Sequence, residues 1–144
     1  MSVTLLGAAD VSAPLISVPY YVDKVPAGFP SPAQGYEEAR LDLNELCIKR
    51  PTSTFMLRCD GDSMIDLGIL SGDILVVDRS ITAKHGDVVI ASVDGDLTVK
   101  TLHLRPRARL MPANRRYSPI ELREGQELQI WGVVTNIVRE MKRG

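Results

Sequence analysis

The sequence is poor in the residues on which several common kinds of functional site depend. Aromatic residues make up 5% of the 144 residues, and there are two cysteines and two histidines. Two cysteines do not form a disulfide framework, and two distant histidines do not suggest a zinc site, so we expect no metal ion and no other cofactor. With so few aromatic rings, the core of the protein must be mostly aliphatic.

The chain also lacks a strong net charge and a long hydrophobic run. Seventeen basic residues against eighteen acidic ones leave a formal charge of −1. Because a nucleic-acid-binding domain is usually clearly basic, sequence-specific DNA binding is not expected. No apolar run approaches the roughly 18 residues of a membrane span, and the opening MSVTLLGAAD lacks the basic stretch of a signal peptide. We therefore expect a cytoplasmic protein without membrane contact.

The remaining features indicate one domain preceded by an arm. A chain of 144 residues is typical of a single domain. Residues 1–32 contain five prolines without apolar periodicity, and proline favours extended backbone in its neighbourhood. The sequence therefore predicts an extended N-terminal arm over residues 1–32, for which a disordered tail is an equally open interpretation. The domain proper is expected over residues 33–144.

The pattern of that domain is mostly β. A short helix is predicted after Asp42, which can cap it, and Pro51 follows. Six strands are then predicted, separated by turn sequences, of which Asp94-Gly95 is the clearest hairpin. Their ranges are Thr54–Cys59, Ile74–Asp78, Asp87–Val93, Asp96–Leu104, Ala108–Met111 and Leu128–Val138. Many short strands with one small helix favour a compact, rolled or barrel-like domain.

One turn and one strand contain residues that can carry out chemistry together. The segment Cys59–Asp66 places Ser63 among small and polar residues, where a hydroxyl and backbone N–H groups can be exposed together, as a nucleophile with an oxyanion site requires. Lys100 lies in a strand among apolar and small residues, and burial there would lower its pKa toward that of a useful base. By themselves, both features also fit an ordinary turn and a solvated strand face.

Several short motifs in one order make the chemical interpretation more specific. They are Gly61–Asp66, Gly72–Asp78, His85–Val89, Leu97–Lys100, Pro112–Asn114 with Tyr117–Ile120, and Trp131–Val134. Together they resemble the LexA/UmuD (S24-like) family of self-cleaving serine–lysine peptidases, and most closely its UmuD-type SOS mutagenesis members. The resemblance covers about residues 27 to 140, and it implies the LexA C-terminal type of β domain.

The resemblance assigns roles to particular residues. It implies that Ser63 is the nucleophile, that Lys100 is its general base, and that the backbone N–H groups of Asp62 and Ser63 form the oxyanion site. It also implies that Ala27–Gly28 is the bond that the protein cuts in itself. Ala-Gly is typical of LexA-like members, whereas UmuD-type members often have Cys-Gly. On the residues alone, a flexible linker with no reactive role is the favoured interpretation of this proline- and glycine-containing segment.

The family resemblance also implies partners. A RecA filament on single-stranded DNA would stimulate the cleavage, and the trimmed homodimer would serve a UmuC-type translesion polymerase. The chain departs from LexA-type repressors because nothing before residue 33 has the periodicity of a helix-turn-helix. Whether cleavage occurs within one chain or between protomers stays open, as do the polymerase-binding surface and a separate role for the uncleaved form.

Two other functions are alternatives to this one. A non-catalytic, dimeric β-domain interaction module with a flexible arm is the main alternative. A leader-type peptidase has the same chemistry but is membrane-anchored, and no spanning segment is present. Among the remaining residues, Trp131, Cys47 and Cys59 are expected in the core. The five arginines of residues 105–116 are expected on a solvated face, with contact to DNA or an acidic partner as the alternative.

Overall fold

The computed structural model describes residues 1–21, 38–122 and 128–142. The described elements are β1 (Ser2–Ala8), β2 (Ser17–Tyr21), β3 (Glu38–Asp42), α1 (Leu43–Cys47), β4 (Thr54–Asp60), β5 (Ile74–Asp78), β6 (Val88–Val93), β7 (Asp96–His103), β8 (Arg109–Met111), β9 (Ile120–Glu121) and β10 (Leu128–Val138). Two 3₁₀ turns, Pro51–Ser53 and Ile65–Leu67, flank β4 and the loop that follows it.

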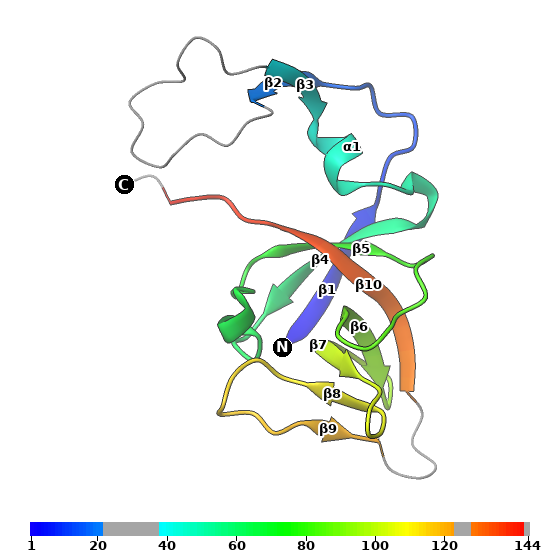
Figure 1. Cartoon of the computed structure of the whole chain (residues 1–144), viewed down its shortest axis with the longest axis vertical. Helices are drawn as coiled ribbons and strands as arrows, with labels where there is room; N and C mark the ends of the chain where they lie inside the picture. Colours follow the sequence, from blue (N-terminus) through cyan, green and yellow to red (C-terminus); the bar gives the residue numbers. More distant parts are fainter. Residues whose placement is uncertain (22–37, 123–127, 143–144) are drawn as a thin grey trace.

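Antiparallel strands form a closed barrel, which lies in the lower half of Figure 1. Six strands follow one another around it in the order β1, β4, β5, β10, β6 and β7, and a bridge between Ser2 and Thr98 joins β1 back to β7. The strands β8 and β9 extend the sheet beyond β7. Closure leaves few unpaired strand edges. The predicted mostly β, barrel-like fold is confirmed.

All six predicted strands are present, with bounds that differ by at most one residue. Two of them, Ile74–Asp78 and Leu128–Val138, are as expected. The hairpin between β6 and β7 turns at Asp94 and Gly95, whose φ angles of 50° and 90° are the positive values that a type I′ turn needs. Turn chemistry therefore located this hairpin correctly from the sequence.

The predicted helix is α1, and the expected cap forms. The Asp42 carboxylate accepts hydrogen bonds from the backbone N–H groups of Asn44 (2.7 Å) and Glu45 (3.1 Å). These bonds satisfy two of the donors that a helix leaves free at its start. The helix ends at Cys47, before the predicted stop at Pro51, which instead begins the next 3₁₀ turn.

The sequence did not predict β1, β2, β3 or β9. The strand β1 is the important one, because the first residues of the expected arm form part of the barrel wall. Its sequence, SVTLLGA, lacks the regular apolar alternation by which strands are recognised, and none of its seven residues is buried. In Figure 1, the β2–β3 hairpin and α1 lie beyond one end of the barrel.

The core is aliphatic, as the low aromatic content predicted. One cluster of buried side chains comprises Leu57, Cys59, Met64, Ile69, Leu75, Val77, Ile90 and Val99. A second comprises Val89, Ala91, Leu102, Leu110 and Val133. Trp131 packs against the first cluster and is only partly buried, with its ring edge-on to Phe55 and beneath the Arg79 guanidinium. Cys59 is buried as expected, whereas Cys47 is half-buried.

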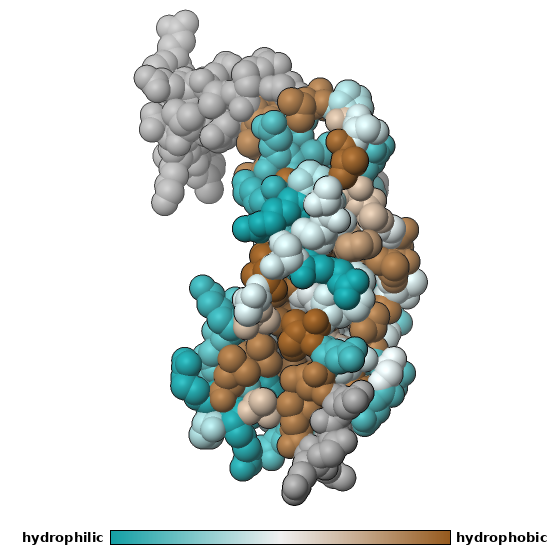
Figure 2. Space-filling view, turned by 90° about the vertical axis from the view of Figure 1, so that its right-hand side faces the viewer, coloured by the Kyte–Doolittle hydropathy of each residue, from teal (hydrophilic) through white to brown (hydrophobic). Residues whose placement is uncertain are grey.

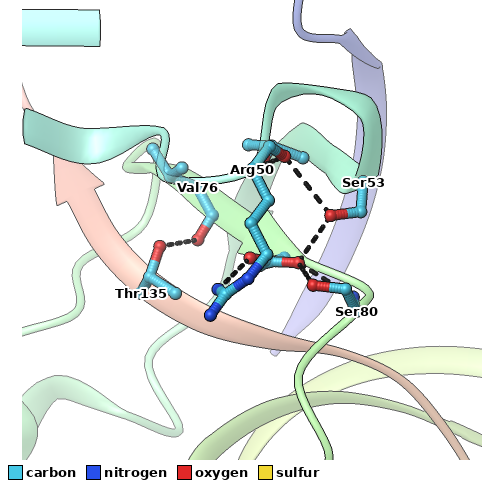
Figure 3. A network of polar contacts seen from close by, with 7 residues as sticks. Arg50, Ser53, Val76, Ser80 and Thr135 are labelled. Atoms are coloured by element: carbon cyan, nitrogen blue, oxygen red, sulfur yellow. Dashed lines mark hydrogen bonds and ion pairs between the residues drawn. The ribbon is translucent and has the colours of Figure 1, made fainter. Parts of the chain in front are cut away.

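A buried carboxylate ties the segment before β4 to the end of β5. Asp78 accepts hydrogen bonds from Arg50 (2.9 Å), the Ser53 hydroxyl (2.8 Å), and the backbone N–H and hydroxyl of Ser80 (2.8 and 2.7 Å). Figure 3 shows Arg50, Ser53 and Ser80, the three residues that supply these donors, side by side in this network. Although burial raises the pKa of Asp78, these hydrogen bonds outweigh burial and lower it to about 2. The ionised carboxylate thus stabilises the fold.

The surface is mixed rather than uniformly polar. Figure 2 shows brown hydrophobic areas between teal ones on the face that it presents. Within the expected basic cluster, Arg105, Arg107, Arg115 and Arg116 are exposed, and Arg107 pairs with Glu121 at 2.9 Å. No helix in the described part of the chain is long and apolar enough to cross a membrane.

Candidate active site

Ser63 lies in the loop between β4 and β5, and its side chain is fully buried. The loop leaves β4 at Gly61, whose φ of +104° lies in the left-handed region that favours glycine. Met64, the next residue after the serine, is also completely buried and anchors the loop in the core. The apolar anchor therefore fixes the position of the neighbouring hydroxyl.

The connection between β8 and β9 holds this loop from the other side. The Ala113 N–H donates to the Ser63 carbonyl (2.7 Å), and the Asn114 side-chain amide donates to the Asp62 carbonyl (2.9 Å). The Tyr117 hydroxyl donates to the Asp62 carboxylate, and this hydrogen bond raises the pKa of Tyr117. Three contacts from one segment thus orient the peptide units on either side of the serine hydroxyl.

Lys100 reaches Ser63 from the neighbouring strand β7. Its Nζ lies 3.1 Å from Ser63 Oγ, 2.8 Å from Thr98 Oγ1 and 3.2 Å from the Val99 carbonyl oxygen. The residue is 4% exposed. Thr98 and Lys100 are two positions apart in a strand, so both side chains point to the same face. The structure therefore brings together the two side chains that the sequence analysis paired.

The surroundings of the lysine fit its neutral form. Burial lowers the pKa of Lys100 below its ordinary value, because a desolvated ammonium group is unfavourable. The hydrogen bond with the α-amino group at the chain's start acts in the opposite direction and is the smaller effect. A neutral amine has two N–H donors and one lone pair. Thr98 and Val99 supply the two acceptors, and the lone pair can then accept the Ser63 O–H.

The first residue of the chain also lies at this point. The Met1 α-amino group donates to Ser63 Oγ at 3.0 Å. The Met1 carbonyl accepts hydrogen bonds from the Thr98 hydroxyl (2.9 Å) and the Val99 N–H (3.3 Å). Burial and the neighbouring Lys100 amine lower the pKa of the Met1 α-amino group to about 6. The N-terminal end of β1 therefore occupies the space beside the serine hydroxyl.

The structure does not test the other site residues that the sequence analysis predicted. Ala27 and Gly28 lie outside the described residues, so the cleavage bond stays a prediction. The oxyanion role of the Asp62 and Ser63 N–H groups also stays a prediction. Among the residues that the structure describes, no group of three or more His, Cys, Asp or Glu side chains is arranged to hold a metal ion.

Sequence reasoning missed the residues around the pair. Thr98, Asn114 and Tyr117 enter the sequence analysis only as parts of matching motifs. The contacts of Asn114 and Tyr117 with Asp62 join segments far apart in the sequence, for which no local pattern exists. The spacing of Thr98 and Lys100 was the one available signal, because alternation places them on one face.

Comparisons with known proteins identify relatives of this chain. The model of the Peptidase S24-like family matches residues 19–135. The protein MucA of Salmonella typhimurium is 48% identical over 125 residues, which are 86% of each chain. The protein SamA of Salmonella typhimurium is 45% identical over 138 residues, or 96% of each chain. A LexA repressor of Alcanivorax borkumensis is 40% identical over 121 residues, which cover 83% of this chain and 58% of that protein.

The match spans most of the chain and includes both Ser63 and Lys100. The similarity covers 86% of MucA and 96% of SamA but only 58% of the LexA repressor, which is longer than this chain. The family predicted from the short motifs is thereby confirmed. The chain belongs to the S24-like peptidase family, as a UmuD-type member.

Proposed function

We propose that the protein is a serine peptidase that cuts its own N-terminal arm at Ala27–Gly28, with Ser63 as nucleophile and Lys100 as general base. The observation that carries the proposal is the distance of 3.1 Å between Lys100 Nζ and Ser63 Oγ, both in buried side chains. A base must lie within about 2.6–3.2 Å of the group whose proton it takes. Membership in the S24-like family supports the same chemistry.

The reaction follows from this geometry. Neutral Lys100 takes the Ser63 hydroxyl proton while Ser63 Oγ bonds to the carbonyl carbon of Ala27. The N–H groups of Asp62 and Ser63 would stabilise the negative oxygen that forms. The C–N bond then breaks, and the Gly28 nitrogen receives the proton from Lys100. Water hydrolyses the resulting ester, with Lys100 taking the water's proton and returning it to Ser63.

Thr98 serves as a positioning residue in this reaction. Its hydroxyl oxygen accepts from Lys100 Nζ while its proton is donated to the Met1 carbonyl. The Val99 carbonyl accepts the second Nζ–H. With both N–H bonds directed away, the lone pair of the neutral amine is left for the serine proton. The same oxygens stabilise the ammonium group once that proton has been transferred.

The biological role is inferred from the UmuD-type resemblance and from family membership. We infer that cleavage converts a homodimer into the accessory subunit of a UmuC-type, error-prone translesion polymerase during the SOS response. A RecA filament on single-stranded DNA would speed cleavage by stabilising the cutting arrangement of the arm. Ala27–Gly28 suits the scissile position because a methyl group and a glycine leave room for attack, and Pro26 and Pro30 favour extended backbone.

Mass spectrometry of the purified protein at several pH values tests the proposal. Self-cleavage releases an arm of 27 residues and a body of 117 residues. Because the neutral amine is the base, the rate should fall as the pH drops through the lowered pKa of Lys100. Ser63→Ala and Lys100→Ala should each stop cleavage. Lys84→Ala, which removes an exposed lysine outside the site, should cut as the wild type does.

Cleavage of the same bond in Ser63→Ala would remove the serine from its proposed role. A wild-type protein that stays intact at every pH and with the RecA filament would instead favour the non-catalytic interaction module.

A further inference from the structure

The strand β1 occupies an unusual place in the barrel. It pairs with β4 along most of its length, from Ser2 opposite Asp60 to Ala8 opposite Phe55. Its pairing with β7 is a single bridge between Ser2 and Thr98, formed at the end nearest Ser63. Figure 1 shows β1, in blue, beside β4, with the start of the chain close to β7. Without β1, the edges of β4 and β7 would be free to accept another strand.

We call the space between the facing edges of β4 and β7 the groove. Residues of β7 hold the backbone of its present occupant by hydrogen bonds. The backbone carbonyl of Met1 accepts hydrogen bonds from the Thr98 hydroxyl and the Val99 N–H. Neither of these bonds involves the methionine side chain. Any extended peptide has a backbone carbonyl group that could accept the same two hydrogen bonds. The groove thus recognises a chain in strand conformation rather than one particular residue at this point.

The position of the Met1 nitrogen connects the groove with the proposed reaction. This atom lies 3.0 Å from Ser63 Oγ. In a longer peptide seated in the same way, the preceding carbonyl carbon would lie about 1.3 Å from that nitrogen. The nucleophile would then be next to the peptide bond. The α-amino group therefore stands where the amine released by cleavage would stand, and β1 runs along the path of the leaving segment.

The strand β1 is also weakly packed compared with its neighbours. None of its residues is buried, and Leu5 and Leu6 are 52% and 48% exposed. Its ladder with β4 is interrupted by a register shift between Leu5 and Gly7. In contrast, β4, β5, β6 and β7 each contribute fully buried side chains to the core. Met1 and Val3 pack against the first core cluster but are only partly buried, so we expect displacement of β1 to cost less than loss of any of those strands.

We propose that the groove between β4 and β7 is a binding site for an extended peptide, and that β1 fills it as a competing occupant which must leave before the cleavable segment reaches Ser63. The proposal rests on the proposed self-cleavage and adds a restraint to it. An arm tethered beside its own catalytic pair would otherwise be cut at once. Any partner that binds β1 in its released form would accelerate cleavage by shifting the population.

A reversible disulfide tests whether β1 must leave. Ser2 and Asp60 are exposed residues directly opposite each other in the ladder, and opposed Cα atoms lie about 4.5–5.5 Å apart, within disulfide range. Ser2→Cys with Asp60→Cys, made together with Cys47→Ser, would lock β1 when oxidised. Ile74→Cys with Val138→Cys, opposite each other in β5 and β10, gives a matched lock that leaves β1 untethered.

We expect the β1–β4 lock to slow self-cleavage at least tenfold when oxidised, and reduction of the same protein to restore it. The β5–β10 lock should cut equally in both states. Equal rates in the oxidised and reduced forms of the β1–β4 variant would overturn the proposal and make β1 a permanent strand of the barrel.

Peptide binding gives a second measurement that needs no cleavage. In the Ser63→Ala background, a fluorescent peptide with the sequence of residues 20–35 should bind the reduced β1–β4 variant at least tenfold more tightly than the oxidised one, by fluorescence anisotropy. Equal binding to both forms, or binding to neither, would refute the groove as a peptide site. If the peptide binds the reduced variant more tightly than the oxidised one but the wild-type protein never cuts itself, the proposed function is refuted and the peptide site is not.

Discussion

The hydrogen bond between Lys100 and Thr98 offers a sharp test of the catalytic geometry. Thr98→Val keeps the size and branching of the side chain and removes the oxygen that lies 2.8 Å from Lys100 Nζ. The variant loses one of the two acceptors that direct the amine toward Ser63. It also loses the donor to the Met1 carbonyl, but β1 and a peptide in the same groove would lose that bond equally.

The size of the effect follows from the charge that develops on Lys100. A hydrogen bond from a neutral amine contributes about 0.5–1.5 kcal/mol, and one from a charged group about 1.5–3 kcal/mol. The hydrogen bond is already present when the amine is neutral. Only the increase in its strength on protonation of Lys100 therefore lowers the barrier. An increase of about 1–1.5 kcal/mol corresponds to a loss of about tenfold in rate. The pKa of Lys100 should also fall further, since the oxygen stabilises the ammonium form more than the amine.

The assay is the rate of self-cleavage from pH 5 to 11, followed by mass spectrometry. Thr98→Val should show a plateau about tenfold lower than that of the wild type, reached at a lower pH. Thr98→Ser restores the oxygen and should recover both the plateau and the pH profile. A Thr98→Val protein with the wild-type plateau and profile would refute the positioning role, and an unchanged profile with a lowered melting temperature would reduce Thr98 to a structural residue.

Two further predictions concern the stability of the barrel. The pKa of Asp78 is about 2 in the folded protein against 3.8 for the free side chain, so its ionised form contributes about 2 kcal/mol above pH 4, lost as the pH falls through 2. Urea unfolding should show Asp78→Asn about 2 kcal/mol less stable at pH 7 and less sensitive to acid, and equal acid sensitivity would contradict the assignment. A Cβ at Gly132 would lie 2.5 Å from Val77 Cγ1, so Gly132→Ala should cost about 1–3 kcal/mol. Adding Val77→Ala should lessen the penalty of Gly132→Ala if the clash is its cause.

Local patterns predicted the elements whose causes are local. The strand β5 and the long strand β10 were found because their apolar runs end at turn residues, and the β6–β7 turn because Asp94-Gly95 tolerates positive φ. The Asp42 cap was recognised because its acceptor lies within three residues of its donors. Each of these features depends on a few neighbouring residues, which a sequence displays directly.

The amino-acid sequence by itself determined the mostly β barrel class and the family, since ordered motifs carry that information, and it pointed to Ser63 and Lys100 as the residues to pair. Only the tertiary structure decided that the two side chains meet in a buried site, that Thr98 and Asn114 orient them, and that β1 closes the barrel beside them. The physical reason is that Ser63 and Lys100, 37 positions apart, meet only through burial and strand pairing. The strand β1 is held by backbone hydrogen bonds, which every residue type can form, so its side chains do not indicate the pairing.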